Sequence, residues 1–322
     1  MQNQNLNYIL EIHKASSISK AAERLSISQP ALSAHIKKVE EQLGSQIFDR
    51  SVKPLQLTEA GAIYIDHMKK QAELDKELEE KLSDLACLKR GALSIGGATF
   101  FNVSYLPNAI GRFVKEYPGI DISIIDGSMP EIVGKALDNE VDLFIAPSWN
   151  LDRRCCYEKI LHERIFICVP PKWKINDKLA EWRIPPEVIL SGGLDTWLRQ
   201  KKQPYVDFSN FRKDPFILLR EDQHIGNIMS RLFARHGFEP GYHITAEQTL
   251  TSYALTLSGA GISLVTEGTL ANGNLKEFPA FYLADFDICK RDIYVAYPKQ
   301  KYLSRASREF IVILKDSLGA VS

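Results

Sequence analysis

The sequence has little cysteine and no long hydrophobic run. Its five cysteines, at positions 87, 155, 156, 168 and 289, are odd in number and form no C-x-x-C pair, which excludes a disulfide framework and a zinc site built on paired cysteines. No stretch of about 18 apolar residues occurs, and the N-terminus lacks a basic region followed by an apolar run, so we expect a cytoplasmic protein with no membrane partner.

An excess of charge of either sign is also missing. Lys+Arg and Asp+Glu both number 40 in the 322 residues, so a surface for nucleic acid must be local rather than spread over the chain. The length suffices for two or three domains of ordinary size.

The short motifs of common enzyme classes are absent as well. The sequence has no G-x-S-x-G, no P-loop, no H-E-x-x-H and no G-x-G-x-x-G after a strand, and these motifs mark hydrolases, nucleotide-binding proteins, zinc proteases and dinucleotide-binding proteins. The seven histidines are scattered. We therefore predict a protein that is not an enzyme, with no catalytic residue, no metal and no cofactor.

Residues 1–44 are predicted to form three helices with a tight turn between the second and the third. An apolar stripe marks the first helix, Ser17 and Ser28 are placed to cap the next two, and Gly44 ends the third. Pro30 is tolerated because the first turn of a helix has no hydrogen bond to lose. The expected buried residues are Leu6, Ile9, Leu10 and His13 on the first helix, Ala21, Ala22 and Leu25 on the second, and Leu32, Ile36, Val39 and Leu43 on the third.

Two short helices joined by a tight turn form a helix-turn-helix, whose second helix sits in the DNA major groove. The polar face of that helix carries Gln29, Ser33, His35, Lys37 and Lys38. The following segment reads as a two-stranded wing, with Arg50 and Lys53 near its tip, which suits phosphate or minor-groove contact. A helix-turn-helix can also be only a packing unit, so this pattern alone leaves both interpretations open.

A long charged helix is predicted from Thr58 to about Leu88. Leu74, Leu78, Leu82 and Leu85 form one stripe along it. The stripe either packs on the rest of the chain or pairs with the same helix of a second chain.

From residue 92 onward, strands and helices alternate, which predicts an α/β fold with a mostly parallel sheet covered by helices. The expected strands are 92–99, 119–127, 141–147, 163–170, 215–219, 241–246, 261–265 and 291–298, and the expected helices include 102–117, 226–236, 250–257 and 305–318. Ser128 and Glu131 form a capping box before a further helix. Ligands of such sheets bind beyond the carboxyl ends of strands, where helix N-termini attract anions.

The N-terminal residues closely resemble the LysR-type transcriptional regulators. The motifs of that family are S-x-x-x-A-A-x-x-L, S-Q-P/S-A-x-S, I-x-x-L-E-x-x-L-G, L-F-x-R and L-T-x-A-G. They are matched by Ser17, Ala21, Ala22, Leu25, Ser28, Gln29, Pro30, Ala31, Ser33, Ile36, Glu40, Leu43, Gly44, Phe48, Arg50, Leu57, Thr58, Ala60 and Gly61.

The resemblance implies an N-terminal winged helix-turn-helix, a long linker helix and a C-terminal two-lobed α/β sensing domain like a periplasmic binding protein. The expected ranges are 1–58 for the DNA-binding domain, 59–90 for the linker (dimerisation) helix, and 91–322 for the effector-binding domain, with lobe I at about 91–163 and 268–322 and lobe II at about 164–267. The implied partners are an operator in double-stranded DNA, a small anionic metabolite as effector, RNA polymerase, and further copies of the chain in a homodimer or homotetramer formed through residues 59–90.

The resemblance also assigns site residues. It implies DNA contacts from Gln29, Pro30, Ser33, Arg50 and Lys53, with Gln29 reading bases because its amide donates and accepts together. The polar face of the third helix adds His35 and Lys37 as expected DNA contacts. Effector contacts are expected from Thr99, Phe100, Ser128, Arg220, His224 and Thr249.

The sequence departs from the family pattern in five places. Val39 and Ile47 each stand where a leucine is usual. Ala34 stands where an arginine is common, with His35 as a possible substitute. Thr266 and Glu267 stand where a proline is usual, and residues 172–214 form a longer segment than usual, which predicts an altered effector cleft. Two alternative functions are a plain small-molecule binding protein and a thiol-redox-responsive regulator that uses the cysteines.

Overall fold

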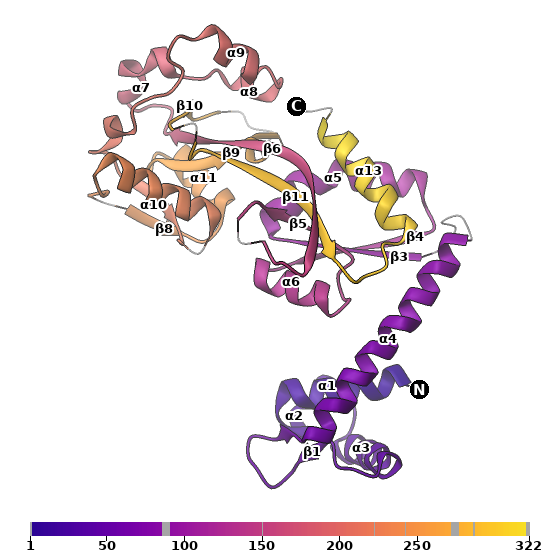
Figure 1. The fold of residues 1–322 in the computed structure, drawn as a ribbon. Helices are drawn as coiled ribbons and strands as arrows, with labels where there is room; N and C mark the ends of the chain where they lie inside the picture. Colours follow the sequence, from indigo (N-terminus) through magenta and orange to yellow (C-terminus); the bar gives the residue numbers. More distant parts are fainter. Residues whose placement is uncertain are drawn as a thin grey trace. The chain divides into compact units, whose positions relative to one another are not determined.

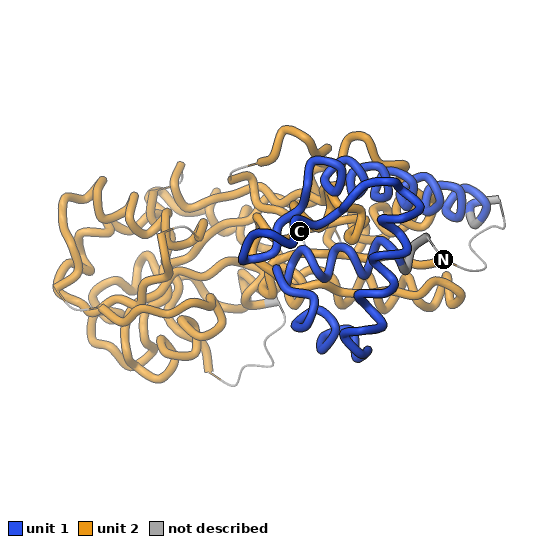
Figure 2. Tube along the Cα trace, turned by 90° about the horizontal axis from the view of Figure 1, so that it is seen from below, with its two compact units in different colours: residues 1–85 blue, residues 86–322 orange. Residues whose placement is uncertain are grey.

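A computed structural model of the protein describes residues 2–85, 91–149, 151–221, 223–241, 243–271, 277–285 and 287–319 (Figure 1). The chain forms two compact units, residues 1–85 and 86–322, which Figure 2 distinguishes by colour. No helix of the described residues is both long and apolar enough to cross a membrane.

Three helices form the head of the first unit, and polar caps set their ends. Ser17 Oγ accepts a hydrogen bond from the Lys20 N–H (3.4 Å), and Ser28 Oγ accepts one from the Ala31 N–H (3.3 Å). Gly44 ends the third helix with φ of +72°, a conformation that glycine adopts without steric cost. The helices are α1 Gln2–Ala15, α2 Ile18–Arg24 and α3 Gln29–Leu43. The predicted helix-turn-helix is confirmed.

The core of the head differs from the predicted stripes at five positions. Leu6, Leu10 and Leu25 are half-buried rather than buried. Leu43 is 41% exposed rather than buried, because it lies in the last turn of α3, where the chain leaves the helix. His13 is exposed, and Ile12 is buried in its place. Each buried aliphatic side chain contributes about 2 kcal/mol. The buried residues are Ile9, Ile12, Ala21, Ala22, Leu32, Ile36, Val39, Ile47, Phe48 and Ile65.

A wing and a long helix complete the first unit. The wing is an antiparallel pair of strands, β1 Phe48–Asp49 and β2 Gln56–Leu57. Helix α4 then spans Glu59–Leu85, and Thr58 Oγ1 caps it by accepting a hydrogen bond from the Gly61 N–H at 2.9 Å. Residues 86–88, the end of the predicted helix, lie outside the described residues.

Lobe I of the second unit is a sheet with helices on both faces (Figure 1). Its strands are β3 Gly91–Gly97, β4 Ile120–Asp126, β5 Leu143–Pro147 and β11 Lys290–Pro298, and its helices are α5 Thr99–Glu116, α6 Met129–Leu137 and α13 Arg305–Gly319. Ile145 packs among side chains of α5 and α13, whereas Phe144 packs with α6, because successive side chains of a strand point to opposite faces.

Lobe II also has helices on both faces of its strands. Ile167 packs with α10, and Phe166 packs with side chains of α8 and α11. The strands are β7 Phe216–Leu219, β8 His243–Ala246, β9 Ser263–Thr266 and β10 Ala280–Tyr282. The helices are α7 Ile175–Lys178, α8 Pro186–Leu190, α9 Leu194–Gln200, α10 His224–His236, α11 Thr249–Leu257 and α12 Glu267–Ala271, with 3-10 turns η1 Ala180–Trp182 and η2 Phe208–Phe211.

Strands β6 and β11 connect the lobes. Strand β6 spans Cys155–Val169. Its first part pairs with β11, and its last residues pair with β9 and β10. The strand order is β10-β6-β11-β5-β3-β4, with β9 also on β6. β3 is parallel to β4 and β5, but every pair that includes β6 or β11 is antiparallel. The prediction of a mostly parallel sheet is therefore wrong for this sheet, because the two connecting strands run against their neighbours.

The chain returns to lobe I later than predicted. Ala280 pairs with Val169 of β6, and Tyr282 and Cys289 lie in the same core as Ile167. The return therefore occurs at the start of β11, near residue 290, rather than near residue 268. The residues before β11 are apolar, and such a pattern suits the core of lobe I as well as the core of lobe II. The sequence alone therefore does not predict in which lobe they pack.

The long segment 172–214 folds onto lobe II, where Ile189 and Leu194 share a core with Phe166. Arg164 of β6 joins this segment to the start of α12. Its guanidinium bonds Asp195 and lies 3.5 Å from Glu267 Oε1. Two departures from the family pattern, the long segment and Glu267, thus meet at one arginine.

Candidate DNA-binding surface and effector site

The N-terminal half of α3 presents a polar surface. Gln29 and Pro30 are exposed and Ser33 is half-buried. Gln29 Nε2 donates a hydrogen bond to Ser33 Oγ at 2.9 Å, so the two side chains hold each other in place. Lys37 is exposed one turn further, 3.8 Å from Glu41. The amide of Gln29 retains an acceptor oxygen beside its second N–H, which is the pattern that adenine requires.

His35 lies apart from this surface. Its Nε2 is 2.6 Å from Asn5 Oδ1, and its ring meets the edge of Tyr8 at 5.0 Å. Both partners belong to α1, so His35 joins two helices of the head. The structure therefore gives His35 a packing role within the head, and its expected contact with DNA stays a prediction.

The wing is attached to α3 through one carboxylate. Glu40 Oε1 accepts hydrogen bonds from the N–H groups of Ile47 (2.9 Å) and Phe48 (3.3 Å), and Glu40 Oε2 accepts one from Arg50 at 2.9 Å. Arg50 stays half exposed in this pair, so it is held by Glu40 and remains accessible to solvent. Lys53 is exposed further along the wing.

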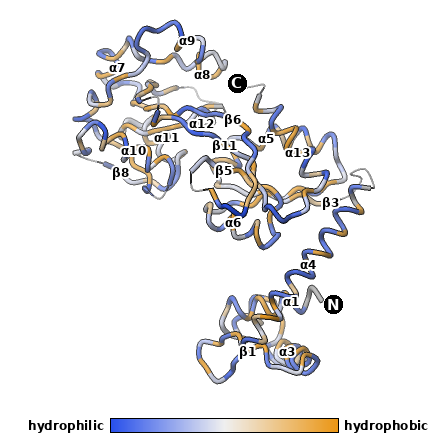
Figure 3. The backbone as a smooth tube through the Cα atoms, in the orientation of Figure 1, coloured by the Kyte–Doolittle hydropathy of each residue, from blue (hydrophilic) through white to orange (hydrophobic). Residues whose placement is uncertain are grey.

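Helix α4 carries an apolar stripe that the described residues leave uncovered. Leu74, Leu78 and Leu82 are 65%, 57% and 57% exposed. Hydrophilic segments interrupt the hydrophobic ones along this helix in Figure 3. The start of the helix is held tightly against the head, because a Cβ on Gly61 would lie 2.1 Å from the Ile47 carbonyl oxygen.

The predicted effector residues of lobe I lie at the carboxyl ends of parallel strands. Thr99 begins α5 directly after β3, and Ser128 precedes α6 after β4. The two strand ends are adjacent, because the Gly127 N–H donates to the Gly97 carbonyl at 3.2 Å. Both Thr99 and Ser128 are exposed. The N–H and the hydroxyl of Ser128 both donate to Glu131 Oε2, at 2.9 and 2.8 Å, so the Glu131 side chain holds this serine at the start of α6.

The predicted residues of lobe II gather in the same way. Thr249 begins α11, and His224 begins α10. Gln223 Nε2 donates to the Glu247 carbonyl at 3.0 Å, which holds the two helix starts side by side. Arg220 is exposed on the loop between β7 and α10.

The two lobes meet at Trp149 and His224. Trp149 follows β5, and its ring lies 5.9 Å from the His224 ring. His224 Nδ1 is buried, and no hydrogen-bond partner for it occurs among the described residues. Burial, with the positive charges of Arg291 and Arg231, lowers the pKa of His224 to about 3, so the imidazole is neutral near pH 7. Sequence reasoning missed Trp149, although its place after a parallel strand was the same signal that selected Thr99 and Ser128.

A buried ion pair lies beside this contact. Arg291 Nε donates to Glu163 Oε2 at 2.6 Å, and the two side chains are 3% and 0% exposed. Glu163 Oε1 accepts hydrogen bonds from the Tyr105 hydroxyl (2.5 Å) and the Gly268 N–H (3.0 Å). Burial, with the charge of Glu163, raises the pKa of Tyr105 well above its usual value.

One guanidinium nitrogen of Arg291 stays without a hydrogen bond. Nη2 is buried and lacks an acceptor among the residues that the structure describes. The guanidinium carbon lies 5.6 Å from the Phe100 ring and 5.2 Å from the Phe101 ring. An unsatisfied buried donor costs about 1–3 kcal/mol, and a charged one costs more. The only sequence signal for Arg291 was that a charged residue stands inside a strand that is otherwise largely apolar.

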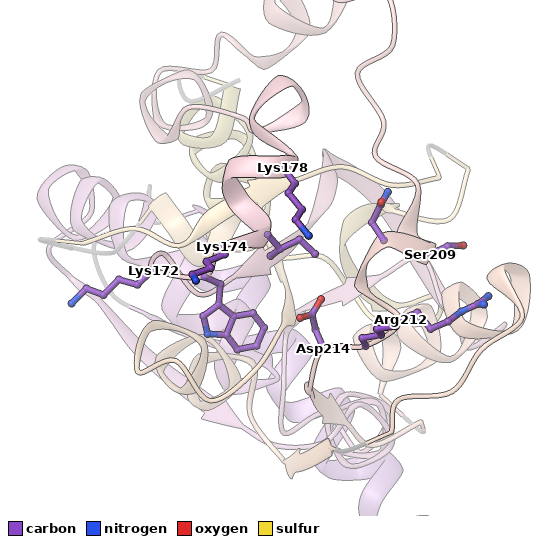
Figure 4. A pocket seen from close by; sticks show the side chains of 10 residues that line it. Lys172, Lys174, Lys178, Ser209, Arg212 and Asp214 are labelled. Carbon is purple, nitrogen blue, oxygen red and sulfur yellow. The ribbon is translucent and has the colours of Figure 1, made fainter.

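A separate basic pocket lies on lobe II, with a volume of about 800 Å³. In Figure 4, Lys178 and Asp214 point towards one another, and Lys172 and Arg212 point away on opposite sides. The walls come from residues 172–178 and 209–214, so the long segment adds a pocket here. None of the predicted effector residues lines this pocket.

Three of the four described cysteines are poor candidates for a redox sensor, whereas Cys156 is only half-buried. Cys155, Cys168 and Cys289 are buried. Burial raises the pKa of the Cys155 thiol and raises that of Cys289 to about 12, so neither forms the reactive thiolate at neutral pH. Cys87 lies outside the described residues. No group of three or more metal-ligating side chains occurs in the described part of the chain.

Models of two protein families cover most of the chain. Residues 4–62 match a bacterial regulatory helix-turn-helix protein model of the lysR family. Residues 88–319 match the LysR substrate binding domain.

Individual proteins of known name align along nearly the full length. The HTH-type transcriptional regulator YcgK of Bacillus subtilis is 26% identical over 317 residues, which cover 97% of this chain and 94% of that protein. CbbR of Rhodospirillum rubrum is 24% identical over 303 residues, which cover 93% and 91%. The crystal structure of full-length CbnR with its target DNA superposes with a TM-score of 0.60 at 19% identity and covers 98% of this chain and 100% of that one.

Proposed function

Because the chain belongs to the LysR family of transcriptional regulators, we propose specific roles for its residues within that function. The protein is a DNA-binding transcriptional regulator with an effector-binding domain, and the family consists of regulators rather than enzymes. The proposed domains are residues 1–58 for DNA binding, 59–90 for pairing of chains, and the remainder for the effector, with the boundary between lobes at β6 and β11.

The proposed DNA contacts are Gln29, Pro30, Ser33 and Lys37 on α3, with Arg50 and Lys53 on the wing. The hydrogen bond between the exposed Gln29 and the half-buried Ser33 is the observation that carries this proposal. Gln29 reads a base edge in the major groove, whereas the cationic side chains neutralise phosphates and make affinity salt-dependent. His35 is left out, because its ring nitrogen is occupied by α1.

The leucine stripe of α4 is proposed to pair two chains. Three exposed leucines on one helix face form an apolar surface, and their burial against an identical stripe stabilises a dimer by the hydrophobic effect. A homodimer, or a homotetramer built from dimers, presents two heads to a two-fold symmetric operator. RNA polymerase is the proposed protein partner at the promoter.

A small anionic effector is proposed to bind at the junction of the lobes. Thr99, Phe100 and Ser128 form one wall, and Arg220, His224 and Thr249 form the other. An effector that prefers one arrangement of the lobes shifts the population towards it. By reciprocal linkage, the same effector then changes the affinity or the bend of bound DNA.

Selection of DNA from the organism's own genome tests this function. The purified full-length protein is mixed with genomic fragments at low salt, and the retained fragments are sequenced. We expect a few loci with a shared two-fold symmetric sequence, bound at least about 10³-fold more tightly than bulk DNA. Uniform retention of all fragments, or of none, contradicts the proposal.

A further inference from the structure

The basic pocket on lobe II carries a surplus of positive charge. Of its described lining residues, five are cations and one, Asp214, is a carboxylate. The cations are Lys172, Lys174, Lys178, Arg212 and Lys213. A concave surface lined by charge of one sign raises the local concentration of ions of the opposite sign, so this pocket favours anions.

The four lysines of this pocket are not paired with carboxylates. No ion pair among the described residues includes any of them. Lys178 points towards Asp214 in Figure 4, but these two residues do not form an ion pair either. An ammonium group has three hydrogen-bond donors, so the lysines can all bind a negatively charged ligand.

A buried asparagine fixes the wall formed by residues 172–175. Asn176 is 4% exposed. Its Nδ2 donates hydrogen bonds to the carbonyls of Pro170 (2.8 Å) and Pro171 (3.2 Å), and its Oδ1 accepts one from the Tyr282 hydroxyl (3.0 Å). Tyr282 belongs to the core of lobe II, so this wall is anchored to the core.

The opposite wall is held by local hydrogen bonds. Asp207 Oδ1 accepts one from the Ser209 N–H at 2.9 Å, and Asn210 Nδ2 donates one to the Asp207 carbonyl at 2.8 Å. Arg212 Nη2 donates to the His236 carbonyl at 3.4 Å. Because the backbone of both walls is fixed, little ordering of the chain is needed when a ligand binds, which lowers the cost of binding.

An aromatic side chain completes the lining. Trp173 is half-buried and packs against the core of lobe II, and it also lines the pocket. The volume of about 800 Å³ lies within the usual range for sites of small molecules. The pocket thus combines unpaired cations, an aromatic surface and room for a ligand of the size of a metabolite.

We propose that this pocket is a second ligand site, which binds the di- or triphosphate chain of a nucleotide or of inorganic polyphosphate. Lysine binds phosphate as a point charge on a flexible stem. A chain of phosphates carries several charges and meets cations of both walls at once, whereas a single carboxylate meets one of them. None of the predicted effector residues lines the pocket, so this site goes beyond the proposed effector and DNA contacts.

Titration calorimetry on the full-length protein compares four probes at low salt and without divalent cations. The probes are ATP, AMP, inorganic triphosphate and citrate. We expect ATP and triphosphate to bind about tenfold or more tightly than AMP and citrate, because only a longer phosphate chain reaches the cations of both walls. Tighter binding of ATP than of triphosphate identifies a nucleotide that stacks on Trp173, and equal binding identifies polyphosphate.

Variants then locate the binding. Lys174→Gln with Lys178→Gln should weaken the binding of triphosphate about tenfold, because two charge contacts are lost. Asp214→Asn should tighten it about threefold, because the carboxylate that repels the ligand is removed. Lys202→Gln with Lys299→Gln is the matched control, since both lysines are exposed outside the pocket and the net charge changes by the same amount.

The affinity of each variant for selected genomic DNA separates this inference from the proposed function. A variant of Lys174 and Lys178 that loses triphosphate but retains DNA supports the inference. The inference is overturned if triphosphate does not bind, if AMP or citrate binds as tightly, if the control loses as much affinity, or if the pocket variant also loses DNA. Failure of the unaltered protein to bind DNA, with triphosphate still bound, would instead contradict the proposed function alone.

Discussion

At the scale of single residues, the structure separates polar side chains that are already satisfied from those that are free to bind. His35 and Glu40 are occupied by partners within the head, whereas Gln29 and Ser33 bond only each other on an exposed face. We expect Gln29→Ala with Ser33→Ala to lower specific DNA affinity about tenfold or more, because a lost base contact costs about 1–3 kcal/mol. Non-specific affinity should not change.

The affinity for a selected genomic fragment and the affinity for bulk DNA are measured at the same salt concentration. Their ratio reports the specificity of DNA binding. Lys53→Ala is the control, since loss of a phosphate contact weakens both kinds of binding alike. An unchanged ratio in the double variant would remove the base-reading role of this pair.

His224 predicts a loss of stability in acid. Its pKa is lowered to about 3 in the folded protein, by burial and by the charges of Arg291 and Arg231. The unfolded chain has a pKa near 6.5 and therefore binds the proton first. The free energy of unfolding therefore receives the full contribution of neutral His224 above about pH 6.5. It falls by up to about 1 kcal/mol as the pH drops by one unit below that value. Urea unfolding, followed by tryptophan fluorescence, measures it.

In the variant His224→Gln, the free energy of unfolding should decline less steeply over the same pH range. His13→Gln is a control, because His13 is exposed on the head. Parallel pH profiles for the unaltered protein and His224→Gln would show that His224 is not the titrating group.

At the scale of elements, α4 predicts how chains associate. Leu74→Glu with Leu78→Glu places charges in the exposed stripe, and we expect a shift from dimer to monomer at micromolar concentration, because the charges would lose hydration on pairing. Lys76→Glu, on the opposite side of the helix, is the control and should remain a dimer. Sedimentation velocity distinguishes the two states. A dimer that survives the double substitution places the contact elsewhere.

Signals within a few residues of sequence predicted the ends of helices well. The pairing of elements that lie far apart in the sequence was predicted poorly. Ser17, Ser28 and Gly44 set the helix ends as predicted, because caps act within a few residues. The antiparallel course of β6 and β11 was missed, since strand direction depends on partners far away in the chain. Arg291 was missed for the same reason, because its role depends on Glu163, which is 128 positions away.

At the scale of the whole molecule, burial makes three of the four described cysteines poor redox sensors, and Cys156 is half-buried. The thiol of Cys289 has its pKa raised to about 12 by burial, so it cannot form a reactive thiolate at neutral pH. We expect brief alkylation of the native protein to leave DNA binding and every effector response unchanged. Gel shifts before and after treatment provide the check, and a response that disappears would restore the redox alternative.

The central claim is that two paired copies of the α3 surface read one operator. Footprinting of the protein on a selected genomic fragment tests it most directly. We predict two protected half-sites on one face of the duplex, with centres about 10 base pairs, or a multiple of that, apart, and a single weak footprint for the Leu74 and Leu78 variant. One isolated protected site with the unaltered protein, or equal footprints for both proteins, would contradict the claim.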